Sequence, residues 1–208
     1  LKRCTQAVQQ RNTVRFAAIA LLLTGLIGGT ATLLTWLFAD GGNVSGFVSA
    51  ALPLAAGLIR NLLLLLGICL LTGVYEEAFM RVLGIEAFER ALDTKRAILA
   101  SAALFALLHV GAPDVSAGQL VLLQTALKFG QALLFGVILG ALYARTRRLW
   151  PCAFIHAGFD ILYMAPNVLL TGTMPETYAS GAVGDTVLLA VSVLMLSGIV
   201  LKIRKEIA

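Results

Sequence analysis

The sequence predicts an all-α fold, a polytopic bundle of transmembrane helices, and two observations lead to that prediction. Of the 208 residues, 59% are hydrophobic and 13% are charged, and the mean hydropathy is +0.91. The core of a soluble domain does not need so much apolar surface. Several stretches also run for about 18 residues or more with almost no charge, the length of a helix that crosses a hydrocarbon core of roughly 30 Å. This composition excludes a cytosolic enzyme, a nucleic-acid-binding protein and a secreted disulfide scaffold.

Six apolar runs predict about six spanning helices. These runs cover residues 16–39, 61–80, 97–112, 119–144, 149–170 and 183–201. The apolar segment 46–59 is too short to span and contains Pro53, so we expect a re-entrant or interfacial piece there. The sequence as a whole predicts a single integral-membrane domain over residues 1–208, with a motif-bearing core at about 60–165.

Most basic residues fall on the same side of the membrane when the predicted spans are counted in order along the chain. With six spans, 14 of the 16 Lys and Arg residues fall on one side of the membrane. They are Lys2, Arg3, Arg11, Arg15, Arg81, Arg90, Lys95, Arg96, Arg145, Arg147, Arg148, Lys202, Arg204 and Lys205. Because cytoplasmic loops carry the excess of Lys and Arg, we expect both termini in the cytoplasm.

A short set of ionisable residues falls within these spans or at their ends. Insertion of such a side chain at the bilayer centre costs about 2.5–3.5 kcal/mol on insertion scales, so each one is expected to have a structural or functional role. Both histidines of the protein are in the set. The set consists of Glu76, Glu77, Arg81, His109, Lys128, His156 and Asp160.

A spacing of four residues, which brings side chains to one face of a helix, recurs in this set. Glu77 precedes Arg81 by four residues, so the two are expected to pair. Glu76 is rotated from Glu77 by about 100° around the helix and stays free for another role. Phe105 lies four residues before His109, where its ring is expected to hold the imidazole in one rotamer.

His156 and Asp160 also lie four residues apart, so their side chains converge on one face of the fifth span. Together with Glu76 and His109, this pair forms a set that can activate water and stabilise an oxyanion. For both histidines to meet Glu76, the third helix must begin near Asp93 or tilt strongly.

Three linked motifs resemble those of a known family. They are EEAFMR at 76–81, FALLH at 105–109 and HAGFD at 156–160. In type and order they are similar to the EExxxR, FxxxH and HxxxN/D signatures of the CAAX-protease and bacteriocin-processing family, also called CPBP or Abi. The resemblance implies a glutamate-type intramembrane endopeptidase related to the enzymes that trim prenylated CAAX proteins.

The resemblance also implies a role for each motif residue. Glu76 with His109 would bind and deprotonate the attacking water, while His156 with Asp160 would hold the oxyanion. The expected bracing residues are Glu77, Arg81 and Phe105. No cofactor is expected, and the expected partners are the lipid bilayer and a hydrophobic or lipidated peptide or protein substrate, without nucleic acid. The expected location is the inner or plasma membrane of a prokaryote.

Asp160 departs from the prenyl-protein enzymes, which carry Asn at this position, and three interpretations stay open. An ionised carboxylate cannot donate a hydrogen bond to an oxyanion. Either burial keeps Asp160 protonated, or Asp160 orients His156, or the site binds a divalent metal. In the last case the metal ligands would be Glu76, His109 and His156.

Two other functions are compatible with the same residues. The chain could be a non-catalytic relative that acts as a membrane binding or immunity factor, with the polar cluster only holding helices together. Alternatively, it could be a small transporter, because Gln124, Lys128 and Gln131 form a polar stripe on the fourth span. A complete set of motifs favours the enzyme.

Overall fold

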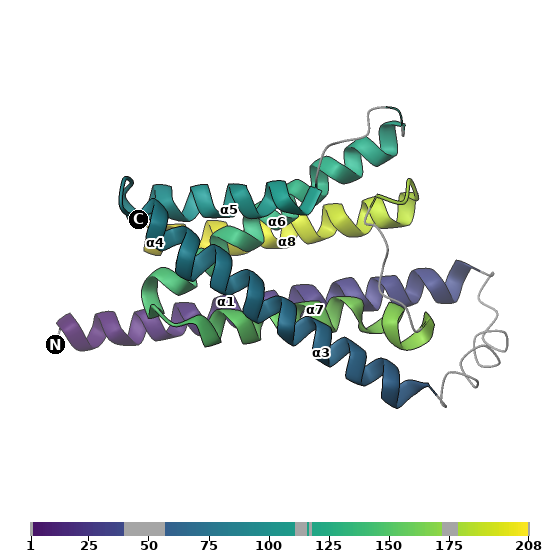
Figure 1. Ribbon diagram of the computed structural model, residues 1–208, viewed down its shortest axis with the longest axis horizontal. Helices are drawn as coiled ribbons and strands as arrows, with labels where there is room; N and C mark the ends of the chain where they lie inside the picture. The colour runs from purple at the N-terminus through teal and green to yellow at the C-terminus, as the bar shows by residue number, and fades with distance from the viewer. Residues whose placement is uncertain (1, 40–56, 111–115, 117, 172–178, 208) are drawn as a thin grey trace.

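The computed structural model describes residues 2–39, 57–110, 116, 118–171 and 179–207, and these residues are helical apart from short turns (Figure 1). No strand occurs within these ranges, which confirms the all-α prediction. The elements are α1 (Lys2–Ala39), α3 (Leu58–Glu77), the π-helix η2 (Ala78–Ile85), α4 (Glu86–Phe88), α5 (Thr94–Val110), α6 (Gln119–Thr146), α7 (Leu149–Thr171) and α8 (Val183–Ile207).

The helices are those of a membrane bundle. Among the described residues, four segments are long and apolar enough to cross a membrane, namely Val14–Ala31, Leu58–Phe88, Gln119–Thr146 and Val183–Ile203. The apolar part of α7, Leu149–Ala165, is shorter, and α5 has 17 residues, so these two remain predicted spans. Most of the predicted re-entrant piece, residues 46–56, lies outside the described residues, and its last two residues belong to α3.

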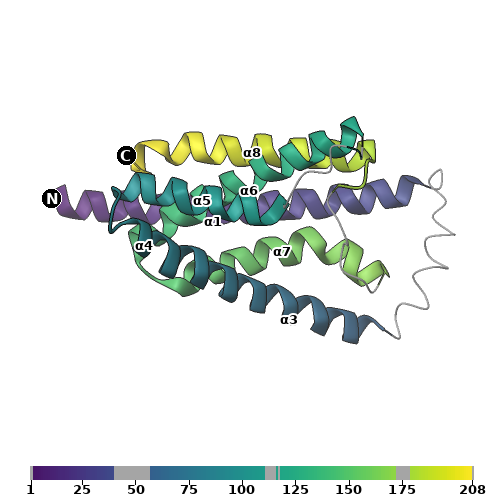
Figure 2. The same cartoon turned by 45° about the horizontal axis from the view of Figure 1, so that its top comes forward.

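In the part of the chain that the structure describes, the six longer helices form two groups of three. In one group α7 packs between α1 and α3, and in the other α6 packs between α5 and α8. Both chain termini, α4 and the short connection between α6 and α7 lie at the same end of the bundle (Figures 1 and 2). This arrangement agrees with the expectation, from the distribution of basic residues, that both termini lie on one side of the membrane. The assignment of that side to the cytoplasm stays a prediction.

Glycine permits the close approach of helices at two places that position the site. A Cβ on Gly73 of α3 would lie 2.7 Å from the carbonyl oxygen of Ala153 on α7. A Cβ on Gly136 of α6 would lie 3.0 Å from the Cα of Ala102 on α5. Small residues at such contacts are a general device for packing helices in membranes.

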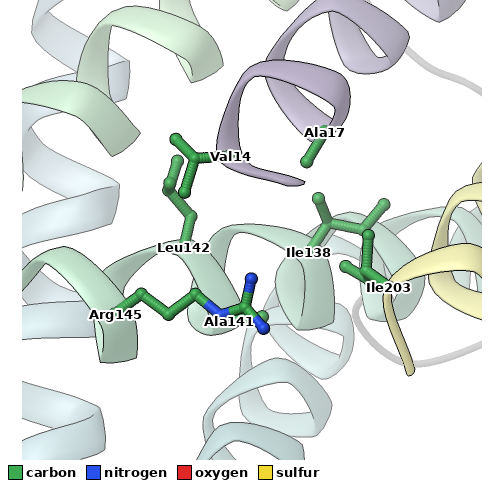
Figure 3. Close-up of a pocket in the computed structure, with 7 residues that line it drawn as sticks. All are labelled: Val14, Ala17, Ile138, Ala141, Leu142, Arg145 and Ile203. Carbon is green, nitrogen blue, oxygen red and sulfur yellow. The ribbon is translucent and has the colours of Figure 1, made fainter. Parts of the chain in front are cut away.

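The seam between α1, α6 and α8 is filled. Apolar side chains from the three helices surround a cavity of about 10 Å³, and Arg145 reaches along it (Figure 3). A space of about 10–15 Å³ holds a single water molecule. This cavity is therefore too small for a substrate, in contrast to the space between α3 and α5 described below.

Candidate active site

A buried ion pair stands at the centre of the polar cluster. The Arg81 guanidinium donates from Nε to Glu77 Oε2 at 2.8 Å and from Nη2 to Glu77 Oε1 at 3.2 Å. Both side chains are 0% exposed. The expected pair is therefore present, and its bidentate geometry fixes the direction of the carboxylate.

Glu77 has a second partner that the spacing of residues does not reveal. His156 Nδ1 on α7 lies 2.9 Å from Glu77 Oε1. A carboxylate paired with a guanidinium accepts hydrogen bonds only, so the proton of this contact resides on Nδ1. Glu77 thus joins Arg81 to the imidazole, and Nε2 of His156 is directed toward Glu76 and Asp160.

A π-helix begins directly after these two glutamates. The wide turns of η2 cover Ala78–Ile85, and the Ser101 hydroxyl of α5 donates to the Met80 carbonyl oxygen at 2.6 Å. Such turns inserted in α-helices are frequent at functional sites. Nothing in the hydrophobic pattern predicts this change of helix type.

Glu76 faces both imidazoles. Its Oε2 lies 3.8 Å from His109 Nε2 and 3.7 Å from His156 Nε2. These separations exceed a direct hydrogen bond. The same oxygen is buried without a hydrogen-bond partner among the described residues. A strong acceptor is therefore available between two histidines.

His109 is held in a defined orientation. Its Nδ1 lies 2.9 Å from the carbonyl oxygen of Phe105, which can only accept, so Nδ1 carries a proton and Nε2 faces Glu76. The Phe105 ring packs on the imidazole with centroids 4.1 Å apart, and the Arg81 guanidinium lies 5.2 Å from the centre of the same ring. Helix α5 begins at Thr94, next to Asp93, as expected for a histidine at this depth.

His156 is held on its other side by Asp160 and an aromatic ring. Nε2 lies 3.4 Å from Asp160 Oδ2, and the Phe135 ring of α6 meets the imidazole edge-on with centroids 4.9 Å apart. Sequence reasoning missed Phe135, because an apolar residue within an apolar helix carries no distinguishing signal. The structure thus brings together all four predicted catalytic residues and the three predicted bracing residues.

A cavity of about 440 Å³ opens beside Glu76 and His109. Helices α3 and α5 meet near α4 and diverge toward the other end of the bundle (Figures 1 and 2). The residues that line the cavity are Tyr75, Glu76, Phe79, Met80, Phe105, Leu108 and His109. Ligand pockets have volumes of about 300–1,000 Å³ and mostly apolar walls. This cavity can therefore accept an apolar or peptide group next to the carboxylate.

The polar stripe of α6 mainly joins helices. Gln124 is buried and donates to the Ala182 carbonyl oxygen, and Gln131 donates to the Ser192 hydroxyl of α8 at 2.7 Å. Lys128 donates to Gln131 Oε1 at 3.0 Å. The two glutamines thus bind α6 to α8 and its preceding turn, rather than facing a conduit.

A metal site is not apparent in the side chains that the structure describes. Within that part of the chain, no group of three or more His, Cys, Asp or Glu residues has the geometry of a metal cluster. His156 Nδ1 is already engaged by Glu77, and its Nε2 faces two carboxylates. The expectation that the chemistry needs no metal stays a prediction.

Comparison with protein families gives one finding. Residues 58–162 match the family model described as type II CAAX prenyl endopeptidase Rce1-like. The matched region includes all three motifs and the cavity. No curated protein and no solved structure gives a significant match to the chain.

Proposed function

This chain belongs to the Rce1-like type II CAAX prenyl endopeptidase family, and from that premise we propose that it hydrolyses a peptide bond of a hydrophobic or lipidated protein by a glutamate-activated water. The observation that carries the proposal is Glu76 Oε2, a buried acceptor directed at two imidazoles beside an apolar cavity. Family membership implies the endopeptidase activity, and the geometry supports the assignment of roles.

In the proposed first step, water binds between Glu76 and His109. The Glu76 carboxylate takes a proton as the water oxygen attacks the scissile carbonyl carbon. Because Nδ1 of His109 donates to Phe105, its Nε2 can accept the second hydrogen of the water and align a lone pair with the carbonyl. The carbon–oxygen bond that forms converts the carbonyl into a tetrahedral oxyanion.

In the proposed second step, His156 stabilises this oxyanion. Its Nδ1–H is fixed by Glu77, so donation from Nε2 to the developing negative charge requires the imidazolium form, which the adjacent carboxylates of Glu77 and Asp160 favour. Asp160, at 3.4 Å from Nε2, keeps the ring in place. Collapse of the intermediate breaks the carbon–nitrogen bond, and Glu76 returns its proton to the leaving amine.

The cavity supports the choice of an apolar substrate. Tyr75, Phe79 and Leu108 line it and are also exposed on the side of the bundle. An opening on this side faces the lipid when the bundle lies in a membrane, so a lipid-anchored or hydrophobic segment can enter without crossing water.

The test is hydrolysis of a fluorogenic prenylated CAAX peptide by the purified protein in lipid vesicles. Glu76→Gln should lower kcat by about 10²-fold or more, because general base catalysis is worth 10²–10⁴-fold, and should leave the thermal unfolding unchanged. Glu86→Gln, a glutamate outside the site, is the matched control and should stay active. An active Glu76→Gln variant, or a wild-type protein that binds the peptide without cleaving it, contradicts the proposal.

Adjacent leucines on α5 test the cavity. Leu108 lines it, whereas the neighbouring Leu107 is exposed and does not. Leu108→Trp should therefore raise KM for the prenylated peptide, and Leu107→Trp should not. Equal effects of the two substitutions would place the substrate elsewhere.

Metal dependence is tested on the same preparation. Elemental analysis should show no stoichiometric zinc, and a chelator should leave the rate unchanged. Loss of activity on chelation with recovery on adding metal would replace the glutamate mechanism by a metal-assisted one.

A further inference from the structure

Ser101 of α5 makes a hydrogen bond to another helix. Four threonines in the bundle instead donate to the carbonyl oxygen four residues earlier in the same helix, namely Thr24, Thr30, Thr125 and Thr146. That local bond is a usual one for a Ser or Thr inside a helix. Ser101 is 0% exposed and donates to the Met80 carbonyl oxygen of η2 at 2.6 Å. Its hydroxyl therefore links α5 to the π-helix.

The same residue lies on the face of α5 that carries the site. Ser101 precedes Phe105 by four residues and His109 by eight, so the three side chains share one face of the helix. This face meets α3 and η2 through all three residues. The contacts extend along about 12 Å of the axis of α5. The two outer contacts are those of Ser101 and His109.

Of these three contacts, only that of Ser101 is a short hydrogen bond. The Arg81 guanidinium lies 5.2 Å from the centre of the Phe105 ring, and such contacts persist at separations up to about 6 Å. His109 Nε2 and Glu76 Oε2 are 3.8 Å apart, farther than a direct hydrogen bond. The bond from Ser101 is therefore the contact that most limits how far α5 can shift along η2.

We propose that Ser101 is a positioning residue, whose bond to Met80 fixes α5 against η2 and thereby sets the separation between His109 and Glu76. This inference rests on the proposed function, because that separation matters to the rate only if Glu76 and His109 share the attacking water. A misplacement of about 1 Å can lower a rate by about 10²-fold. The working face of α5 thus begins one helical turn before Phe105.

The test measures kcat and KM for the prenylated peptide in vesicles, together with thermal unfolding. Ser101→Ala removes the donor with little change in volume. It should lower kcat by about tenfold or more and leave KM within about twofold, because the alignment of the water changes and the cavity walls remain.

A conservative variant should restore the rate. Ser101→Thr keeps the hydroxyl and should recover kcat relative to Ser101→Ala. If the extra methyl group prevents folding, Ser101→Cys takes its place. A thiol is a weaker donor of similar size, so this variant should have a kcat between those of wild type and Ser101→Ala. If Ser101→Ala itself does not fold, Ser101→Cys is compared with the control below.

Ser192→Ala is the matched control. Ser192 is also buried and also joins two helices, because it accepts from Gln131 at 2.7 Å and so links α8 to α6. Loss of its hydroxyl should lower the temperature of thermal unfolding and leave kcat and KM unchanged. A purely structural role of Ser101 would give the same result in Ser101→Ala.

Hydrogen exchange measures the contact without a substrate. Local opening governs the exchange of amide hydrogens. The amides of residues 78–85 should therefore exchange faster in Ser101→Ala than in wild type, and at the wild-type rate in Ser192→Ala.

Three results would overturn the proposal: an unchanged kcat in Ser101→Ala, an equal loss of kcat in Ser192→Ala, or unchanged exchange of residues 78–85 in Ser101→Ala. The proposed function fails separately, through an active Glu76→Gln variant. Loss of activity in Glu76→Gln with an unchanged kcat in Ser101→Ala would overturn this inference alone.

Discussion

Two bidentate glutamate–arginine pairs occupy opposite environments in this protein. Glu77 and Arg81 are 0% exposed in the middle of the bundle. Glu89 and Arg147 lie at its end, with bonds of 2.6 and 2.7 Å and side chains that are 20% and 46% exposed. The desolvation cost is therefore large for the Glu77–Arg81 pair and small for the Glu89–Arg147 pair.

The difference between the pairs lies in their third partner. Glu89 also accepts from the Thr94 hydroxyl at 2.9 Å, which fastens the turn before α5 to the end of α6. Glu77 instead accepts from His156, an ionisable ring directed at the cavity-side carboxylate. A buried ion pair adds little net stability, because its desolvation cost offsets the attraction between the charges. Here the buried pair orients a histidine, whereas the exposed pair only joins two segments.

Removal of one buried partner is the largest expected effect. Glu77→Gln leaves Arg81 uncompensated in a low-dielectric interior and should cost about 3–5 kcal/mol of stability, together with most of the activity. Glu89→Gln, the same change in the exposed pair, should cost about 1 kcal/mol or less. Thermal unfolding of both variants in the same detergent measures the contrast, and equal losses would mean that burial does not distinguish the two pairs.

A second variant tests the packing that brings Glu77 to His156. Gly73→Ala places a methyl group 2.7 Å from the Ala153 carbonyl oxygen, so α3 must move away from α7. We expect a loss of about 1–3 kcal/mol, typical of overpacking, and a lower kcat. Gly67→Ala on the same helix meets nothing within 4 Å and should change neither quantity appreciably. A tolerated Gly73→Ala would show that the site does not depend on this close approach.

Substitution of Arg147 should have a smaller effect. This residue closes α6 with φ of 49°, in the left-handed region. Arg147→Ala loses the exposed pair, worth about 0–1 kcal/mol, and keeps the unfavourable backbone. Arg147→Gly loses the same pair but relieves the backbone, so it should be the more stable of the two by about 1 kcal/mol. If thermal unfolding shows Arg147→Ala to be the more stable variant, the backbone conformation at this position is not strained.

The smallest effect is a pH dependence confined to the exposed pair. The hydrogen bonds from Arg147 lower the pKa of the Glu89 carboxyl below its ordinary value. A lowered pKa in the folded state means that Glu89 contributes stability above the ordinary value of about 4.3 and loses it as the pH falls further. The difference in stability between wild type and Glu89→Gln should therefore be present at neutral pH and vanish in acid. High salt at neutral pH should also reduce it, because exposed pairs are screened.

Local spacing accounts for the part of the site that could be predicted. The pair Glu77–Arg81 and the contact between Phe105 and His109 each join residues four apart on one helix, and helix geometry alone brings them together. The abundance of apolar residues likewise determined the membrane class and the helical fold. The three motifs were sufficient to indicate the family, which the match over residues 58–162 confirms.

Tertiary structure decided the contacts between helices. Glu77 and His156 are 79 residues apart, and no periodicity states how far one helix is turned or shifted along another. Within a chain where almost every face is apolar, the hydrophobic pattern does not select one packing. The close approach of α3 and α7 at Gly73 and the π-helix after Glu77 fix how these helices pack. Both are properties of the folded bundle rather than of any single helix.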